Sequence, residues 1–170
     1  WSDTPPYCNE HGGTVLNAAV LLNGEYPVEV CVRQLKEPKV ILESADMGTY
    51  GEFTDIAALQ DCHNPFDAFA LHKAALIACG IIPAEGGSLN SITDRIGGLY
   101  LSTQMHNVPK GSGLGTSSIL AGACVKALFK YFGLPCTEPD LYNHAMCMEQ
   151  IMSTGGGWQD QVGGMTEGIK

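Results

Sequence analysis

A glycine-rich segment at 109–118 contains the residue types that most directly suggest chemistry. It reads Pro-Lys-Gly-Ser-Gly-Leu-Gly-Thr-Ser-Ser and leads from a predicted strand into a predicted helix. Glycines let the backbone approach a ligand closely, and successive N–H groups at a helix start form an anion-binding concavity. The segment lacks the Gly-Lys-Ser/Thr ending of a Walker A loop. It therefore predicts a phosphate site of another kind, and the alternative is a plain turn whose hydroxyl residues cap a core helix.

Two carboxylates, Glu149 and Asp160, could serve the same site. Asp160 lies in a second glycine-rich stretch, 155–164, which we predict to be a flexible loop, and Glu149 lies near the end of a predicted helix. A carboxylate beside a phosphate site can accept a proton from an attacking hydroxyl or bind Mg²⁺. The sequence leaves a simpler interpretation open, in which Glu149 is a solvated helix residue and Asp160 a turn former.

The composition excludes several classes of protein. Of 170 residues, 45% are hydrophobic and 16% are charged, which is typical of a chain with a real core rather than a disordered one. The formal net charge of −9 argues against a nucleic-acid partner. No apolar run approaches the ~20 residues of a membrane span, so we predict no membrane association. None of the seven cysteines forms a C-x-x-C pair, and we predict reduced thiols in a cytoplasmic protein.

The elements that must position these residues begin with predicted strands. An apolar run at 14–22 is followed by Asn23-Gly24, a pair suited to a tight hairpin turn. Alternating valines predict a second strand at 28–33, and a third follows at 39–43. We expect these three strands to form an antiparallel meander.

Helices dominate the rest of the predicted chain, so the predicted class is α+β. The remaining elements, in chain order, are a helix at 64–79, a strand at 98–105, and helices at 116–132 and 138–152. Thr137 and Asp140 resemble a capping box for the last helix. Cys124 and Cys147 fall in apolar helical stretches, and we predict both to be small core residues.

The glycine-rich segment resembles the second motif of the GHMP kinases, Pro-x-x-x-Gly-Leu-Gly-Ser-Ser, a superfamily that includes galactokinase, homoserine kinase and mevalonate kinase. Thr116 and Ser117 stand at its two serine positions. The eleven-residue spacing from Glu149 to Asp160 is similar to that between the metal-binding glutamate and the catalytic aspartate of these kinases. The pair Asp160-Gln161 resembles the one that galactokinase-like members carry.

The opening WSDTPPY…HGG resembles the first motif of the fucokinase and heptose-kinase branch of the superfamily. The three motifs, in this order, extend over nearly all 170 residues. The resemblance implies the fold of the GHMP kinase N-terminal domain, which is α+β and similar to ribosomal protein S5 domain 2. It implies that residues 1–170 are this ATP-binding domain and a fragment of a longer protein. The C-terminal GHMP domain would lie beyond Lys170, and the segment that opens the first motif would precede Trp1.

The same resemblance implies an activity and its partners. It implies a kinase that uses ATP and Mg²⁺ to phosphorylate a monosaccharide, L-fucose, at the anomeric hydroxyl, giving fucose 1-phosphate for GDP-fucose salvage. The alternatives are a kinase for a heptose phosphate and a non-catalytic module of the same fold. The isolated fragment would be inactive, because the rest of the site would come from the C-terminal domain.

Site roles follow from the resemblance residue by residue. Asp160 would be catalytic, and Ser117 with Glu149 would bind the metal. The residues that would hold the ATP phosphates are Pro109, Lys110, Gly111, Ser112, Gly113, Leu114, Gly115, Thr116, Ser117 and Ser118. The residues that would contact the sugar are Asp3, Glu10, His11, Gly12 and Trp158. The sequence leaves open that Glu10 and His11 are turn residues, that Lys110 is an exposed lysine and that Trp158 is a core anchor.

Overall fold

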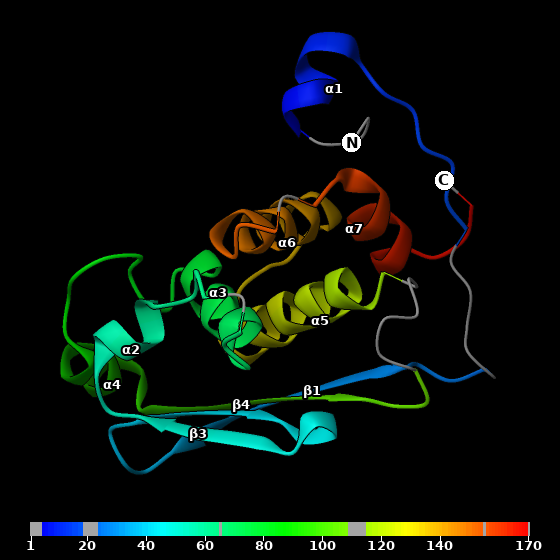
Figure 1. Cartoon of the computed structure of the whole chain (residues 1–170). Coiled ribbons are helices and arrows are strands. Elements are labelled where there is room, and N and C mark those ends of the chain that lie inside the picture. The colour runs from blue at the N-terminus through cyan, green and yellow to red at the C-terminus, as the bar shows by residue number, and fades with distance from the viewer. Residues whose placement is uncertain (1–4, 19–23, 65, 109–114, 155, 170) are drawn as a thin grey trace.

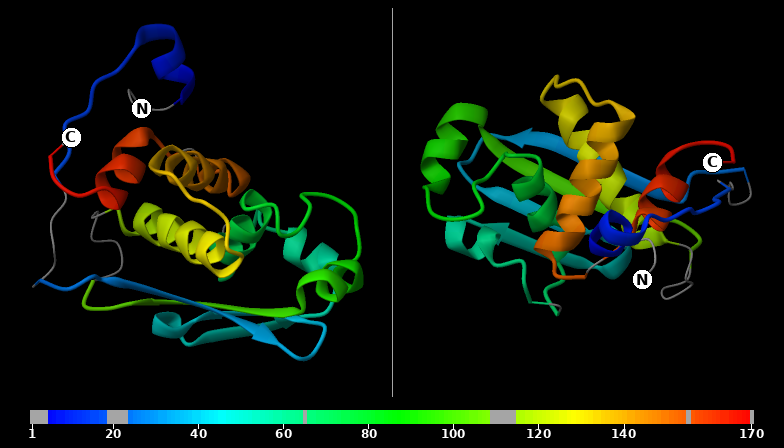
Figure 2. Two further views of the ribbon diagram at one scale, coloured as in Figure 1. Left: turned by 180° about the vertical axis from the view of Figure 1, so that it is seen from behind. Right: turned by 90° about the horizontal axis from the view of Figure 1, so that it is seen from above.

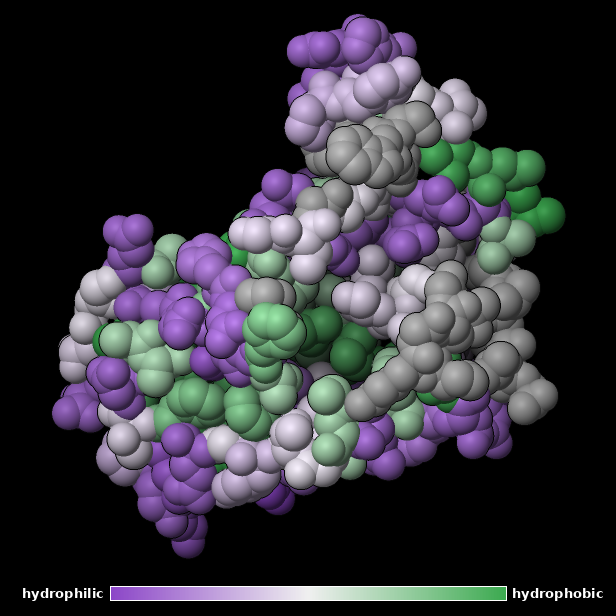
Figure 3. Space-filling model, viewed as in Figure 1, coloured by the Kyte–Doolittle hydropathy of each residue, from purple (hydrophilic) through white to green (hydrophobic). Residues whose placement is uncertain are grey.

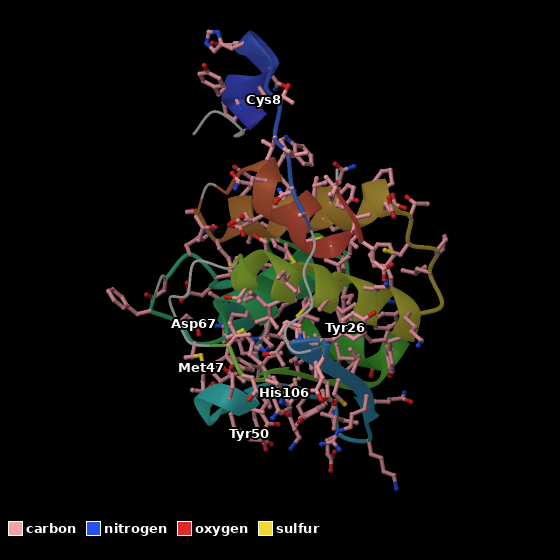
Figure 4. The ribbon with its side chains drawn as sticks, turned by 90° about the vertical axis from the view of Figure 1, so that its right-hand side faces the viewer. Cys8, Tyr26, Met47, Tyr50, Asp67 and His106 are labelled. Carbon is pink, nitrogen blue, oxygen red and sulfur yellow. The ribbon has the colours of Figure 1, made fainter. Side chains whose placement is uncertain are left out.

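The computed structural model describes residues 5–18, 24–64, 66–108, 115–154 and 156–169. A four-stranded sheet forms one layer, helices α3 (Ala70–Ala78) and α5 (Thr116–Tyr131) pack on it, and α6 (Glu138–Ile151) and α7 (Trp158–Met165) lie over those helices (Figures 1 and 2). Helix α1 (Pro5–His11) stands at the far side of α7, joined by an extended segment. In Figure 4, Cys8 of α1 and Tyr50 of the sheet mark opposite ends of the molecule.

The sheet has the order β1-β4-β2-β3. Its strands are β1 Val28–Leu35, β2 Val40–Ser44, β3 Thr49–Phe53 and β4 Gly98–Met105. Strand β4 runs antiparallel to β1 and parallel to β2, so it separates the two strands that we predicted to be neighbours. The predicted meander is therefore wrong. Leu99 and Leu101 of β4 are buried, and such an apolar strand gains most at the centre of the sheet.

The predicted first strand is also absent from the part of 14–22 that the structure describes. Residues 14–17 belong to no helix or strand, and Ala18 makes an isolated antiparallel bridge with Ile169. Residues 19–23, which include half of the predicted Asn23-Gly24 turn, lie outside the described residues. The strands at 28–33, 39–43 and 98–105 are confirmed within two residues.

Helix α3 begins at Ala70, six residues later than predicted. The reason is a side-chain turn: Asp67 Oδ1 accepts a hydrogen bond from Phe69 N–H at 2.9 Å, and its Oδ2 lies 2.5 Å from Lys73 Nζ. Both members of this ion pair are largely buried. Aspartate side chains that bond nearby N–H groups compete with helix formation, so the segment before Ala70 remains a turn. Helices α2 (Ile56–Gln60) and α4 (Leu89–Ile96) and the short helix η1 (Ala45–Met47) were not predicted.

The two long helices agree with the sequence prediction. The capping box of α6 is present, with Thr137 Oγ1 accepting from Asp140 N–H at 3.3 Å and Asp140 Oδ2 accepting from Thr137 N–H at 3.0 Å. Cys124 is fully buried in the core, as predicted, whereas Cys147 is exposed on α6 and that prediction is wrong. Six of the cysteines are free thiols in the structure, namely Cys31, Cys62, Cys79, Cys124, Cys136 and Cys147. None of the helices described here is long and apolar enough to cross a membrane.

His72 of α3 is a buried polar residue within this core. Its Nε2 lies 2.9 Å from the Glu43 carbonyl oxygen and 2.9 Å from Thr103 Oγ1, which makes Nε2 the donor. Nδ1 is buried and has no partner among the described residues. Burial lowers the pKa of His72 to about 4, against the smaller opposing effects of the Glu43 carbonyl, Asp67 and Asp46. The imidazole is therefore neutral at pH 7.

We expect His72 to make the fold acid-sensitive. The unfolded chain protonates this histidine near pH 6.5 and the folded chain near pH 4, so its contribution is intact above pH 6.5 and is lost as pH falls toward 4. The loss amounts to about 3 kcal/mol of unfolding free energy at pH 4. His72→Gln keeps a donor near the Nε2 position without a titrating group. Urea unfolding of both proteins from pH 7.5 to 4 should show a steeper decline for the parent, and parallel declines would contradict this role.

Candidate active site

The glycine-rich segment ends at the start of α5. Gly115 is the N-cap residue and has φ = 65°, a left-handed conformation that favours glycine. The first hydrogen bond of the helix runs from Ile119 N–H to the Gly115 carbonyl at 3.1 Å. The N–H groups of residues 116–118 precede it and point out of the helix end, where they favour an anion. Residues 109–114 lie outside the described residues, so the phosphate roles of Pro109, Lys110, Gly111, Ser112, Gly113 and Leu114 stay predictions.

Asp160 lies against this helix start. A methyl group on Gly115 would be 3.3 Å from Cγ of Asp160 and 3.4 Å from its Oδ1. Asp160 is exposed and occupies the first turn of α7, so its carboxylate is near the positive ends of two helices, α5 and α7. The structure thus places the predicted catalytic carboxylate beside the predicted phosphate site.

The stretch at 155–164 is mainly a helix, and our prediction of a flexible loop there is wrong. Helix α7 covers Trp158–Met165. Two of its glycines allow close packing: a side chain at Gly163 would collide with Asn17, and one at Gly164 would collide with Ile119 of α5. The glycines in this helix bring neighbouring segments together, which offsets the usual cost of glycine in a helix.

Glu149 is not a solvated residue, since only 6% of it is exposed. Ser118 Oγ donates to its Oε1 at 3.2 Å, and Thr154 Oγ1 lies 2.5 Å from its Oε2. Gln161 Nε2 in turn donates to Ser118 Oγ at 3.3 Å. The hydroxyl that contacts Glu149 is therefore that of Ser118, while Ser117 is exposed one residue earlier in the same turn.

These oxygen groups suit a hard cation. A carboxylate and hydroxyls are ligands that Mg²⁺ accepts, and Mg²⁺ usually takes one or two carboxylates together with substrate phosphates. Glu149 also lies in the last turn of α6, where the negative helix end favours a cation. Within the described ranges there is no group of three or more His, Cys, Asp or Glu that could hold a metal by itself. A metal bound through Glu149 could take its remaining ligands from water, hydroxyl groups or substrate phosphates.

A cavity of about 270 Å³ opens beside α7, close to Asp160 in the chain. Its lining residues are Cys8, Gly13, Val15, Asn17, Trp158, Gln159 and Val162. Two of these lining residues are joined by a hydrogen bond, in which Asn17 Nδ2 donates to the Gln159 carbonyl oxygen at 2.6 Å. The volume is slightly below the ~300–1,000 Å³ that is usual for small-molecule sites. The structure therefore places Trp158 in the wall of a small cavity, and Asp160 follows it by two residues in the chain without lining that cavity.

The other predicted sugar residues do not line this cavity or lie outside the described residues. Glu10 and His11 are exposed at the end of α1, with His11 Nε2 3.5 Å from Glu10 Oε2. Gly12 is exposed with φ = 70° and follows that helix. Asp3 lies outside the described residues. The sugar-contact roles of these residues stay predictions.

Sequence reasoning missed the residues that surround Glu149 and the cavity, namely Thr154, Gly156, Gln161 and Asn17. A prediction of helix at 158–165 would have identified Gln161, because consecutive helical residues point in different directions and an exposed Asp160 then implies a buried Gln161. We predicted a loop there, and a loop gives no such periodicity. Thr154 lies five residues after Glu149, beyond the helix end, and has no periodic signal.

Comparison with known proteins supports the motif resemblance. Residues 85–168 match the family model of the GHMP kinases N terminal domain. The L-fucokinase/L-fucose-1-P guanylyltransferase of Bacteroides fragilis is 38% identical over 100% of this chain and 18% of that protein. The bifunctional fucokinase/GDP-fucose pyrophosphorylase of Arabidopsis thaliana is 38% identical over 100% of this chain and 15% of that protein. The chain thus spans less than a fifth of the length of these curated relatives.

A solved structure shows the same fold at lower identity. The D-glycero-D-manno-heptose 1-phosphate kinase of Bacteroides thetaiotaomicron superposes with a TM-score of 0.68 at 21% identity, covering 99% of this chain and 49% of that one. At this identity the likeness concerns the fold alone. Motifs, sequence and fold agree, and the chain belongs to the GHMP kinases, with the fold of their N-terminal domain.

Proposed function

We propose that the intact protein is an ATP-dependent sugar kinase that phosphorylates L-fucose at its anomeric hydroxyl, yielding fucose 1-phosphate for GDP-fucose salvage in the cytoplasm. The observation that carries the proposal is the position of Asp160 beside Gly115 at the start of α5, where a methyl group on Gly115 would meet its carboxylate. It puts a carboxylate beside N–H groups that favour phosphate oxygens, which is the pairing that phosphoryl transfer to a hydroxyl requires. The two fucokinase relatives support L-fucose as the substrate.

The residues would act mainly by positioning. The N–H groups of residues 116–118 would bind phosphate oxygens of ATP, and their orientation at the helix end would stabilise charge as it develops. Asp160 would orient the acceptor hydroxyl and accept its proton as the new bond from oxygen to the γ-phosphorus forms and the bond from that phosphorus to the bridging oxygen breaks, which releases ADP. Glu149, together with the Ser117 hydroxyl, would hold Mg²⁺, which when bound would neutralise phosphate charge. Trp158 would form a wall of the sugar site.

We further propose that residues 1–170 are the N-terminal, ATP-binding domain of a longer protein whose C-terminal GHMP domain completes the site. The length of the relatives supports this. Exposed apolar side chains also support it: Leu16 is 81% exposed and Ile169 is 78% exposed. Figure 3 shows apolar surface beside the C-terminal end of the chain, over the segment that follows α1. Such a patch is typical of a surface that another part of a protein covers.

A kinase assay of the intact protein with a panel of acceptors tests the activity. The panel is L-fucose, D-galactose, a heptose phosphate and no acceptor, with ATP and Mg²⁺ in each reaction. We expect L-fucose to give the largest increase in ADP release over the reaction without acceptor, and phosphorus NMR of the product to show an anomeric phosphate.

Other outcomes would contradict the proposal in different ways. Preferred turnover of the heptose phosphate would assign the acceptor to the second candidate, which the likeness to a heptose-phosphate kinase fold favours. ADP release that no acceptor raises, from a protein that still binds ATP, would leave a non-catalytic module of the same fold.

A further inference from the structure

Three buried side chains from three helices form a connected path that ends at the Glu149 carboxylate. Gln161 of α7 has no exposed surface, Ser118 of α5 is 4% exposed, and Glu149 of α6 is 6% exposed. The path runs from Gln161 Nε2 to Ser118 Oγ, 3.3 Å apart, and from Ser118 Oγ to Glu149 Oε1, 3.2 Å apart. It crosses the point where the starts of α5 and α7 meet the end of α6.

Hydrogen-bond chemistry fixes the direction of every bond in this path. A carboxylate only accepts, so the single hydroxyl hydrogen of Ser118 points at Glu149. Ser118 Oγ must then accept from Gln161, which sets the amide with Nε2 toward the serine. Thr154 Oγ1 lies 2.5 Å from the other carboxylate oxygen and 3.1 Å from the Glu149 carbonyl oxygen, and the shorter distance to the charged acceptor assigns its single hydrogen to the carboxylate. Both oxygens of Glu149 are thus oriented by neutral donors, which leaves its charge available to a cation.

The backbone at Gly156 approaches two members of the path closely. A methyl group at Gly156 would lie 2.8 Å from Glu149 Oε2 and 3.1 Å from Gln161 Nε2. The segment after α6 therefore closes directly over the carboxylate and the amide. Glu149 Oε2 and Gln161 Nε2 are therefore packed against the same backbone position, Gly156.

Stability alone does not account for a glutamine at this place. Gln161 Oε1 is buried and lacks a partner among the described residues. A buried oxygen without a hydrogen bond costs free energy, whereas methionine has nearly the same shape and carries no such cost. What the amide adds is the bond to Ser118, and hence the orientation of Glu149.

We propose that Gln161 is a positioning residue that, through the Ser118 hydroxyl, orients the Glu149 carboxylate for the metal bound with the nucleotide. The inference rests on the proposed function, because it takes Glu149 to be a metal ligand. Groups that orient a ligand from behind typically change metal affinity by about 10–100-fold when they are removed.

The test measures metal binding without turnover. In the intact protein, with ADP present and no sugar, electron paramagnetic resonance of free Mn²⁺ gives the Mn²⁺ dissociation constant. The variants are Gln161→Met, Ser118→Ala, the two combined, and Glu149→Gln. The matched control is Gln150→Met, which replaces an exposed glutamine next to Glu149 on the same helix. Binding of ADP in the presence of a chelator reports the phosphate site independently.

We expect Gln161→Met and Ser118→Ala each to weaken Mn²⁺ binding about tenfold, with metal-free ADP binding unchanged. The double variant should be no weaker than the single ones, because both remove the same path. Gln150→Met should bind Mn²⁺ like the parent. Ser118→Thr, which keeps the hydroxyl, should recover most of the affinity that Ser118→Ala loses.

Two failures would be distinguishable. If Glu149→Gln weakens Mn²⁺ binding while Gln161→Met and Ser118→Ala do not, the positioning role is wrong and the metal assignment stands. If Glu149→Gln itself leaves Mn²⁺ binding unchanged, the metal assignment in the proposed function is wrong. Thermal unfolding of each variant checks the fold. Should Gln161→Met unfold, Ser118→Ala, which removes one oxygen atom from a helix, decides the question alone.

Discussion

Asp160→Asn should lower kcat of the intact protein by about 10²–10⁴, the usual effect of removing a positioned proton acceptor. Asparagine has the same shape and can still orient a hydroxyl, but it cannot take the proton. Asp160 is exposed in the first turn of α7, so the fold should tolerate the change. Steady-state kinetics with ATP and L-fucose would measure kcat, and circular dichroism would verify the fold.

Glu167→Gln is a matched control for this prediction. It removes an exposed carboxylate two residues beyond the end of α7 and makes no contact with Gly115 that the structure shows. Its kcat should equal that of the parent. A kcat within a few-fold of the parent for Asp160→Asn would remove this carboxylate from the mechanism, whichever sugar is the substrate.

Local signals in the sequence were sufficient for the elements that frame the site. Thr137 and Asp140 predicted the start of α6 because a capping box is a contact within four residues. The glycine-rich segment predicted the start of α5 for the same reason, since the conformation of Gly115 and the free helix end are local properties. The strand at 98–105 followed from its own apolar pattern.

Contacts between distant segments could not be predicted in this way. The position of β4 between β1 and β2 depends on which strand gains most from burial, and this is decided across some seventy residues. The burial of Glu149 likewise depends on Ser118 and Gln161, which approach it only when three helices meet. From sequence alone, a polar residue in a helix is predicted to face solvent, and its burial becomes apparent only when the positions of the neighbouring helices are known.

The misassigned segment at 155–164 shows a specific limit in how glycine is interpreted. Glycine is compatible with a flexible loop, with a left-handed turn and with close packing between segments, and the sequence alone does not separate these uses. Gly163 and Gly164 pack closely within a helix, whereas Gly115 has a left-handed φ and also touches Asp160. At Gly115, an alanine substitution can distinguish the need for a left-handed conformation from the need for close approach to Asp160.

We expect Gly115→Ala to lower kcat/KM about 10²-fold. Its methyl group would meet Asp160 Cγ at 3.3 Å, which is tight enough to displace the carboxylate, and the strained φ of 65° would shift the N–H groups at the start of α5. Small displacements of positioned groups have large effects on rate, on the order of 10² for ~1 Å. Steady-state kinetics of the intact protein would measure the change.

Gly133→Ala supplies the matched control at the other end of the same helix. Gly133 has φ = 66°, nearly that of Gly115, but a methyl group there would have no atom within 4 Å. Both variants should lose about 1 kcal/mol of unfolding free energy, because a left-handed conformation costs alanine roughly that much. Only Gly115→Ala should lose activity, since only there does the methyl group reach a carboxylate. Equal kcat/KM values for the two variants would show that the contact between Gly115 and Asp160 has no part in the reaction.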